Sequence, residues 1–187
     1  LPDENLSHLN EQAESRSIQL SMDKQSEPIN DDLNHLNKLR SLLWFRINLD
    51  KIENGESVDE SIFIALADVI KKFPVELDNL RELISGMEDD LYDSDYQNFE
   101  DLRRYCYRVA STVGLCLVEI YGYNDPNARR HAVEMGIYLQ MVNVLRDIQE
   151  DISRNRVYLP AEELAKFGIT ETDLKSGKLS SSKGWQE

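Results

Sequence analysis

Apolar residues recur along most of this chain at intervals of three and four positions, which is the spacing of one face of an α-helix. The 187 residues include only 8 glycines and 5 prolines, so few positions interrupt that periodicity. The pattern therefore predicts an all-α protein. Its helices are expected from Asp31–Asp32 to near Gly55, from 57–61 to Pro74, over 75–92, over 101–123, over 127–153 and from Pro160 to Gly168.

The first part of the chain, residues 1–31, is polar and weakly periodic, and Pro28 interrupts it. We expect a weakly ordered segment there. We also expect one domain over 1–187, because typical domains hold roughly 100 to 200 residues. The chain begins at Leu1 rather than Met, which favours a fragment of a longer protein.

The charge balance narrows the choice of partners. There are 35 acidic and 21 basic side chains, and the formal net charge is −14. Nucleic-acid backbones bind to an excess of clustered Lys and Arg, so the composition argues against a nucleic-acid partner.

Two cysteines, Cys106 and Cys116, lie in one predicted helix. Ten residues separate them by about 15 Å along the helix axis, which is too far for a disulfide within that helix. They are typical of a reducing compartment, so we expect a cytoplasmic location. No apolar run approaches the roughly 18 residues of a membrane span, and peripheral contact with a membrane is left open.

A line of polar residues follows the predicted helix over 127–153. At 100° per residue, Gln140, Asn143, Asp147 and Asp151 fall within an arc of about 80° on one face. Carboxylate and amide oxygens are ligands that Mg²⁺ prefers, and Mg²⁺ commonly bridges to substrate phosphates. The neighbouring arc is apolar and is expected to pack inward; it consists of Ile137, Met141, Val144, Leu145, Ile148 and Ile152.

The spacing of this line has a second interpretation. Charged faces are common on surface helices, and Asp147 and Asp151 could instead pair with nearby cations such as Arg146 and Arg154. The polar line alone leaves both interpretations open.

Three segments resemble the squalene and phytoene synthase family. Residues 139–160, LQMVNVLRDIQEDISRNRVYLP, resemble its second aspartate-rich signature. Residues 105–114, YCYRVASTVG, followed by VEIYGY at 118–123, resemble its other signature at the expected separation. LISGMEDDL at 83–91 is similar to the helix before that signature. The resemblance covers roughly residues 35–187, and it is closer to bacterial phytoene and presqualene diphosphate synthases than to the eukaryotic squalene enzyme.

This resemblance implies an all-α isoprenoid (prenyl) synthase fold that is incomplete at both termini. It implies a prenyltransferase of isoprenoid biosynthesis, of the carotenoid or hopanoid type. The implied reaction is the Mg²⁺-dependent, head-to-head joining of two prenyl diphosphates through a cyclopropyl intermediate, with farnesyl or geranylgeranyl diphosphate as substrate. NADPH would be needed only by a full squalene synthase. The oligomeric state is left open.

The resemblance also implies roles for individual residues. Asn143, Asp147 and Asp151 would hold Mg²⁺ and carry catalysis. The substrate-binding residues would be Gln140, Arg156 and Tyr158 near the diphosphate, and Tyr105, Val109, Ala110, Val113 and Gly114 along the hydrocarbon channel. Close helix packing explains small residues such as Ala110 and Gly114 equally well.

Two features depart from the family pattern. No counterpart of the family's other aspartate-rich motif precedes the helix that begins near Leu33, and the helices that follow Trp185 in relatives are absent. The alternative function is therefore a catalytically silent family member that acts in assembly or interaction. Retention of the acidic line over 143–151 argues against that alternative.

A second acidic segment, DDLYD at 89–93, has the form that head-to-tail prenyl synthases use for Mg²⁺. The resemblance assigns it to a helix outside the catalytic site. Like charges at a helix end repel one another, so we expect neutralisation of Asp89 and Asp93 to leave stability equal or slightly higher.

Overall fold

The computed structural model describes residues 33–92 and 96–176. The chain divides into two compact units, Leu1–Ser41 and Leu42–Glu187. The expected weakly ordered segment over 1–31 lies outside the described residues, and the expectation of a single domain stays a prediction.

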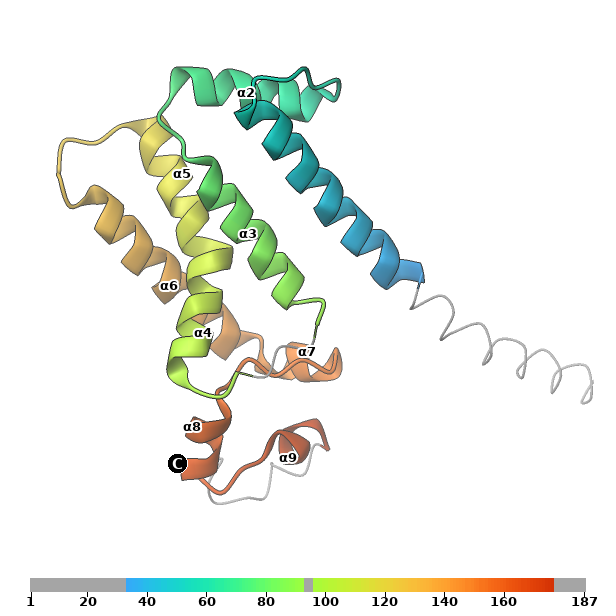
Figure 1. Ribbon diagram of the computed structural model, residues 1–187. Helices are drawn as coiled ribbons and strands as arrows, with labels where there is room; N and C mark the ends of the chain where they lie inside the picture. Colours follow the sequence, from blue (N-terminus) through green and yellow to red (C-terminus); the bar gives the residue numbers. More distant parts are fainter. Residues whose placement is uncertain (1–32, 93–95, 177–187) are drawn as a thin grey trace, which may run out of the picture. The chain divides into compact units, whose positions relative to one another are not determined.

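All regular secondary structure in the described ranges is helical, which confirms the all-α prediction (Figure 1). A helix over 33–53 comes first. The later elements are α2 (Ser61–Lys72), α3 (Leu77–Asp89), α4 (Phe99–Cys106), the π-helix η1 (Tyr107–Ser111), α5 (Thr112–Tyr121), α6 (Ala128–Arg146), α7 (Ile148–Ser153), α8 (Ala161–Lys166) and α9 (Glu171–Lys175). Among these helices, none is long and apolar enough to cross a membrane.

The structure corrects the predicted helices in three places. The helix expected over 101–123 contains the five-residue π-turn η1 between α4 and α5. The helix expected over 127–153 is interrupted at Asp147, where the backbone turns to φ −99° and ψ 10°. Aspartate has a low helix propensity, which is consistent with a break at that position. The short helix α9 was not predicted at all.

The π-turn lies at the centre of the packing, in contact with α3 on one side and α6 on the other (Figure 1). Both contacts depend on a glycine. A Cβ atom at Gly136 of α6 would lie 2.5 Å from the Cα atom of Ser111 in η1. A Cβ atom at Gly86 of α3 would lie 2.7 Å from a methyl carbon of Val109. The helices can approach η1 this closely only because these two positions lack a side chain.

The core beside η1 is built mainly from aromatic and small side chains. Its buried residues are Tyr96, Leu102, Tyr105, Cys106, Val144 and Tyr158. Some apolar side chains of the same helices lie outside this core, since Val113 is 40% exposed and Leu145 is 61% exposed. The expectation that the apolar arc of 137–152 packs inward is therefore wrong at Leu145. Cys106 and Cys116 are both free thiols, as expected.

Candidate diphosphate and metal site

The predicted polar line survives the break between α6 and α7. The Asp147 N–H donates to the Asn143 carbonyl, and the Asp151 N–H donates to the Asp147 carbonyl, both at 2.9 Å. These bonds keep the four-residue spacing of a helix, so Asn143, Asp147 and Asp151 lie on successive turns. The Asn143 side-chain amide also donates to Oε1 of Gln140 at 3.3 Å. The structure therefore brings together all four residues of the line.

Asp147 is bound by its neighbour in the sequence. The Arg146 guanidinium donates to both carboxylate oxygens, from Nε to Oδ1 at 2.7 Å and from Nη2 to Oδ2 at 2.5 Å. These hydrogen bonds hold the pKa of Asp147 below its usual value. The pair matches the surface-pairing interpretation of the sequence for this residue. Because Arg146 is 65% exposed, the pair lies in solvent, where such ion pairs contribute little to stability.

Asp151 lies in a different environment. Within the described parts of the chain it takes part in no ion pair, and burial raises its pKa above the usual value, with a further contribution from the charge of Asp147. It lines a small pocket with Val144, Arg156 and Tyr158. The cavity volume is about 10 Å³, which is close to the space of one water molecule.

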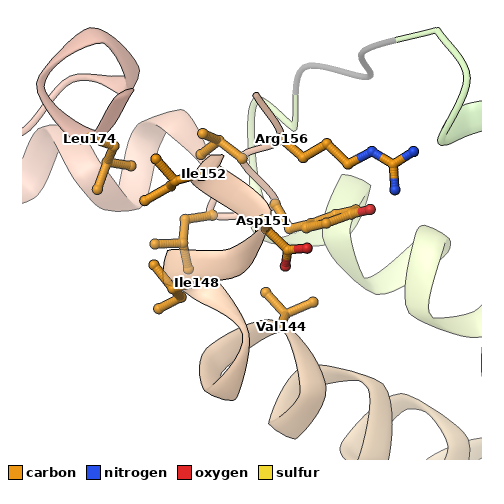
Figure 2. A pocket seen from close by; sticks show the side chains of 9 residues that line it. Val144, Ile148, Asp151, Ile152, Arg156 and Leu174 are labelled. Atoms are coloured by element: carbon orange, nitrogen blue, oxygen red, sulfur yellow. The ribbon is translucent and has the colours of Figure 1, made fainter. Parts of the chain in front are cut away.

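Figure 2 shows that this pocket has a polar and an apolar side. The Asp151 carboxylate and the Arg156 guanidinium extend away from Ile148, Ile152 and Leu174, which gather on the other side. Ile152 packs against the buried cluster that contains Leu174. The apolar side thus attaches α7 to the core, and a carboxylate and a guanidinium are left at the polar side.

Arg156 and Tyr158 are connected to α3 through a residue that sequence reasoning missed. The Tyr158 hydroxyl donates to Oδ1 of Asp90 at 2.8 Å, and the Tyr105 hydroxyl donates to Oδ2 at 3.2 Å. Arg156 Nη2 donates to the Asp90 carbonyl at 3.2 Å. The rings of Tyr105 and Tyr158 stack with centroids 5.0 Å apart and an interplanar angle of 25°. Asp90 is 15 residues from Tyr105 and 68 from Tyr158, so no periodic signal in the sequence relates them.

Asp89 is the residue before Asp90 in the segment DDLYD, and it faces η1. Its carboxylate accepts from Nη1 of Arg108 at 2.9 Å, and Nε of Arg108 donates to Glu82 at 3.0 Å. We expected the like charges at this helix end to repel one another without compensation. The structure corrects this expectation, because Arg108 and two tyrosine hydroxyls bind these carboxylates. Asp93 lies outside the described residues.

The predicted channel residues face several directions. Tyr105 joins Tyr158 in the core, whereas Val109 meets α3 at Gly86. A Cβ atom at Gly114 would lie 3.2 Å from the backbone oxygen of Ala132 in α6. This is the close helix packing that the sequence left open as an alternative for Gly114. Val113 is exposed, and Ala110 is half-buried.

The donor chemistry of the polar line fits Mg²⁺. It offers carboxylate and amide oxygens and no soft ligand, and Mg²⁺ usually takes one or two carboxylates, with waters and phosphate oxygens as its other ligands. Among the residues that the structure describes, no cluster of three or more His, Cys, Asp or Glu side chains could hold a metal by itself. A metal here would therefore depend on a phosphate ligand for part of its coordination.

Comparison with known proteins identifies relatives of this chain. The family model described as squalene/phytoene synthase matches residues 23–187. Chloroplastic phytoene synthase 1 of Arabidopsis thaliana is 45% identical over 122 residues, covering 62% of this chain and 29% of that protein. The 15-cis-phytoene synthase of Synechococcus elongatus is 39% identical over 148 residues, covering 73% of this chain and 47% of that protein. The chain thus spans less than half the length of both relatives.

Two solved structures share the fold. The squalene synthase HpnC from Alicyclobacillus acidocaldarius superposes with a TM-score of 0.69 at 27% identity, covering 77% of this chain and 54% of that one. A dehydrosqualene synthase in complex with ligand gives a TM-score of 0.66 at 29% identity, covering 72% and 47%. These likenesses confirm the isoprenoid synthase fold expected from the sequence.

Proposed function

Because this chain belongs to the squalene/phytoene synthase family, we propose that the protein joins two prenyl diphosphates head to head. The observation that supports this most is the polar line of Gln140, Asn143, Asp147 and Asp151, which stays in helical register across the α6–α7 break beside Arg156. A half-buried carboxylate that forms no ion pair, as is the case for Asp151 among the described residues, suits a bound cation better than it suits the protein alone.

In this proposal Asn143, Asp147 and Asp151 hold Mg²⁺. The ion would neutralise the diphosphate leaving group when the allylic carbon–oxygen bond ionises. Arg146 must release Asp147 for that carboxylate to bind a metal, and its exposed side chain can do so at little cost. Gln140 extends the line toward the diphosphate, and Arg156 supplies N–H donors to its oxygens.

The remaining site residues handle the hydrocarbon part of the substrate. An allylic carbocation reacts with water, so the surface around it must be apolar and dry. Tyr105 and Tyr158 stack on each other in the core, and the Tyr158 hydroxyl, which the resemblance placed near the diphosphate, donates to Asp90 instead. Val109 and Ala110 in η1 and Val113 and Gly114 in α5 follow Tyr105 of α4, and we propose that they line the channel. For Gly114 the contact with Ala132 favours packing against α6 instead.

The identity values favour one product type. The sequence relatives at 45% and 39% identity are named phytoene synthases, whereas the squalene and dehydrosqualene synthase structures are 27% and 29% identical. We therefore place a phytoene-type product from geranylgeranyl diphosphate first and a squalene-type product from farnesyl diphosphate second. NADPH belongs to the proposal only if the product is squalene. Cytoplasmic location and peripheral membrane contact stay predictions.

The proposal is tested by a product assay. The protein is incubated with Mg²⁺ and either farnesyl or geranylgeranyl diphosphate, and released diphosphate and C30 or C40 hydrocarbons are measured. Asp147→Asn and Asp151→Asn should each lower the rate by on the order of 100-fold or more, with unchanged helicity, because they remove charge and little volume. Glu150→Gln is the matched control, since Glu150 lies on the same helix and pairs with the exposed Arg154.

Two outcomes would contradict the proposal. Wild-type rates in both aspartate variants would remove the metal assignment. The absence of any head-to-head product from the wild-type protein with either substrate would favour the alternative, a catalytically silent member that acts in assembly.

A further inference from the structure

Asp90 contacts three residues of the proposed site and has no part in the function described so far. It follows α3 directly as the cap of its C-terminus. Its carboxylate accepts the hydroxyl protons of Tyr105 and Tyr158, and its main-chain carbonyl accepts from Arg156. Residues from α4 and from the segment after α7 thus meet at one residue of α3.

We propose that Asp90 is a positioning residue for the diphosphate site. Its side chain fixes the orientation of the two stacked phenol rings, and its backbone fixes the guanidinium of Arg156. This inference rests on the proposed function, in which Arg156 binds the diphosphate.

The number of hydrogen-bond donors on each of these side chains decides which of them can bind an anion. A tyrosine hydroxyl has one hydrogen, and in Tyr105 and Tyr158 that hydrogen is donated to Asp90. An ionised diphosphate offers only acceptors, so neither hydroxyl can bind it while Asp90 holds both. Arg156 has five N–H donors, and the Asp90 carbonyl takes one of them. Arg156 therefore keeps donors for the anion, whereas the two phenol hydroxyls are occupied by Asp90.

Burial maintains this division of roles. Tyr105 is 5% exposed and Tyr158 is 9% exposed. Burial raises the pKa of both phenols, and for Tyr105 the negative charge of Asp90 is the next largest cause. Both hydroxyls therefore stay protonated and continue to donate to Asp90, and a third ring, that of Tyr96, lies against both of them.

The test compares Asp90→Asn with Asp89→Asn in the full chain. The amide at position 90 has the size of the carboxylate and keeps the main-chain carbonyl, but its single oxygen serves only one of the two hydroxyls well. We expect kcat to fall about 10- to 100-fold, because small misplacements of contact groups cost that much, and KM to change by less than about 3-fold. The tyrosine signal in near-ultraviolet circular dichroism should also decrease, since it reports fixed aromatic packing.

The controls separate positioning from a general loss of structure. Asp89→Asn removes the adjacent carboxylate, which binds Arg108, and should keep the tyrosine signal and a kcat within about 3-fold of wild type. Asp90→Glu restores two acceptor oxygens. If Asp90→Asn lowers kcat by more than about 10-fold, the kcat of Asp90→Glu should be at least about 10-fold higher than that of Asp90→Asn. Tyr158→Phe should keep the affinity for inorganic diphosphate with Mg²⁺ within about 3-fold, because its hydroxyl does not meet the anion.

Specific results would overturn the inference. These are wild-type kcat and an unchanged tyrosine signal in Asp90→Asn, an equal loss in Asp89→Asn, or a loss of diphosphate affinity above about 10-fold in Tyr158→Phe. If Asp90→Asn does not fold, Asp90→Glu and Tyr158→Phe still decide. If the wild-type protein yields no head-to-head product, the proposed function fails, and the dichroism and diphosphate-binding measurements still test Asp90.

Discussion

Two acidic regions of this chain have similar composition and different surroundings. At the end of α3, Asp89 binds Arg108 of η1, and Asp90 binds two buried tyrosines. At the α6–α7 junction, Asp147 binds only the exposed Arg146, and Asp151 has no ion pair among the described residues. The first pair of carboxylates is committed to holding helices together, whereas the second is available to a ligand.

An aspartate pattern is therefore not by itself a metal site. What separates the two regions is the element that faces each one. The π-turn brings Arg108 to α3, and the packing of α3 against η1 depends on Gly86. Asp151 forms no ion pair in the described structure, and burial, followed by the charge of Asp147, raises its pKa.

Gly86→Ala should have the largest effect, because it disturbs the frame of the first region. The added methyl would lie 2.7 Å from Val109 and 2.9 Å from the Cβ atom of Arg108, so η1 must move away from α3. We expect a loss of about 1–3 kcal/mol in the free energy of unfolding, measured by thermal or urea denaturation. Gly114→Ala is the control, since its nearest contact is 3.2 Å and alanine favours helices. Equal melting temperatures for the two variants would contradict the role of Gly86.

Arg108→Met should have the next largest effect. The change leaves Asp89 and Glu82 without their shared cation at a site where the Arg108 side chain is 26% exposed. We expect a loss of about 1 kcal/mol in unfolding free energy, from urea denaturation at low and high salt. If Arg108→Met is as stable as the wild type, the carboxylates at the end of α3 contribute no more to stability through their ion pairs than the exposed Asp147 does.

Arg146→Met makes the same change in the second region and should have the smallest effect on stability. The Arg146–Asp147 pair is exposed and involves adjacent residues, so it connects no separate elements. We expect no measurable shift in melting temperature. A loss as large as that of Arg108→Met would contradict the contrast between the two regions.

Sequence periodicity was sufficient for most of the fold. The 3–4 spacing of apolar residues, together with stop signals such as Gly55 and Gly168, predicted the helices of the described residues except α9. Both glycines adopt positive φ, at +72° and +66°, as helix-ending residues commonly do. The π-turn was not predictable in this way, because it depends on the contacts of Gly86 and Gly136 with η1, and those residues are distant in the sequence.

The candidate site likewise contains residues that the sequence could predict and one that it could not. The sequence could propose Asn143, Asp147 and Asp151, because a spacing of four residues is local information. The break between α6 and α7 leaves the four-residue spacing of these residues unchanged. Asp90 was missed because its partners come from other elements, and its position in an acidic run suggested repulsion instead of hydrogen bonding.

The central claim is that metal and diphosphate bind at the α6–α7 junction and not at the end of α3. The most direct measurement is the rise in melting temperature caused by Mg²⁺ with inorganic diphosphate in the wild-type protein, Asp151→Asn and Asp89→Asn. A ligand that binds only the native state at about 100 times its Kd adds about 2.7 kcal/mol to stability, which is a rise of several degrees. We expect Asp89→Asn to keep this rise and Asp151→Asn to lose most of it. If Asp89→Asn loses the rise and Asp151→Asn keeps it, the metal site lies at the end of α3 and the account is wrong.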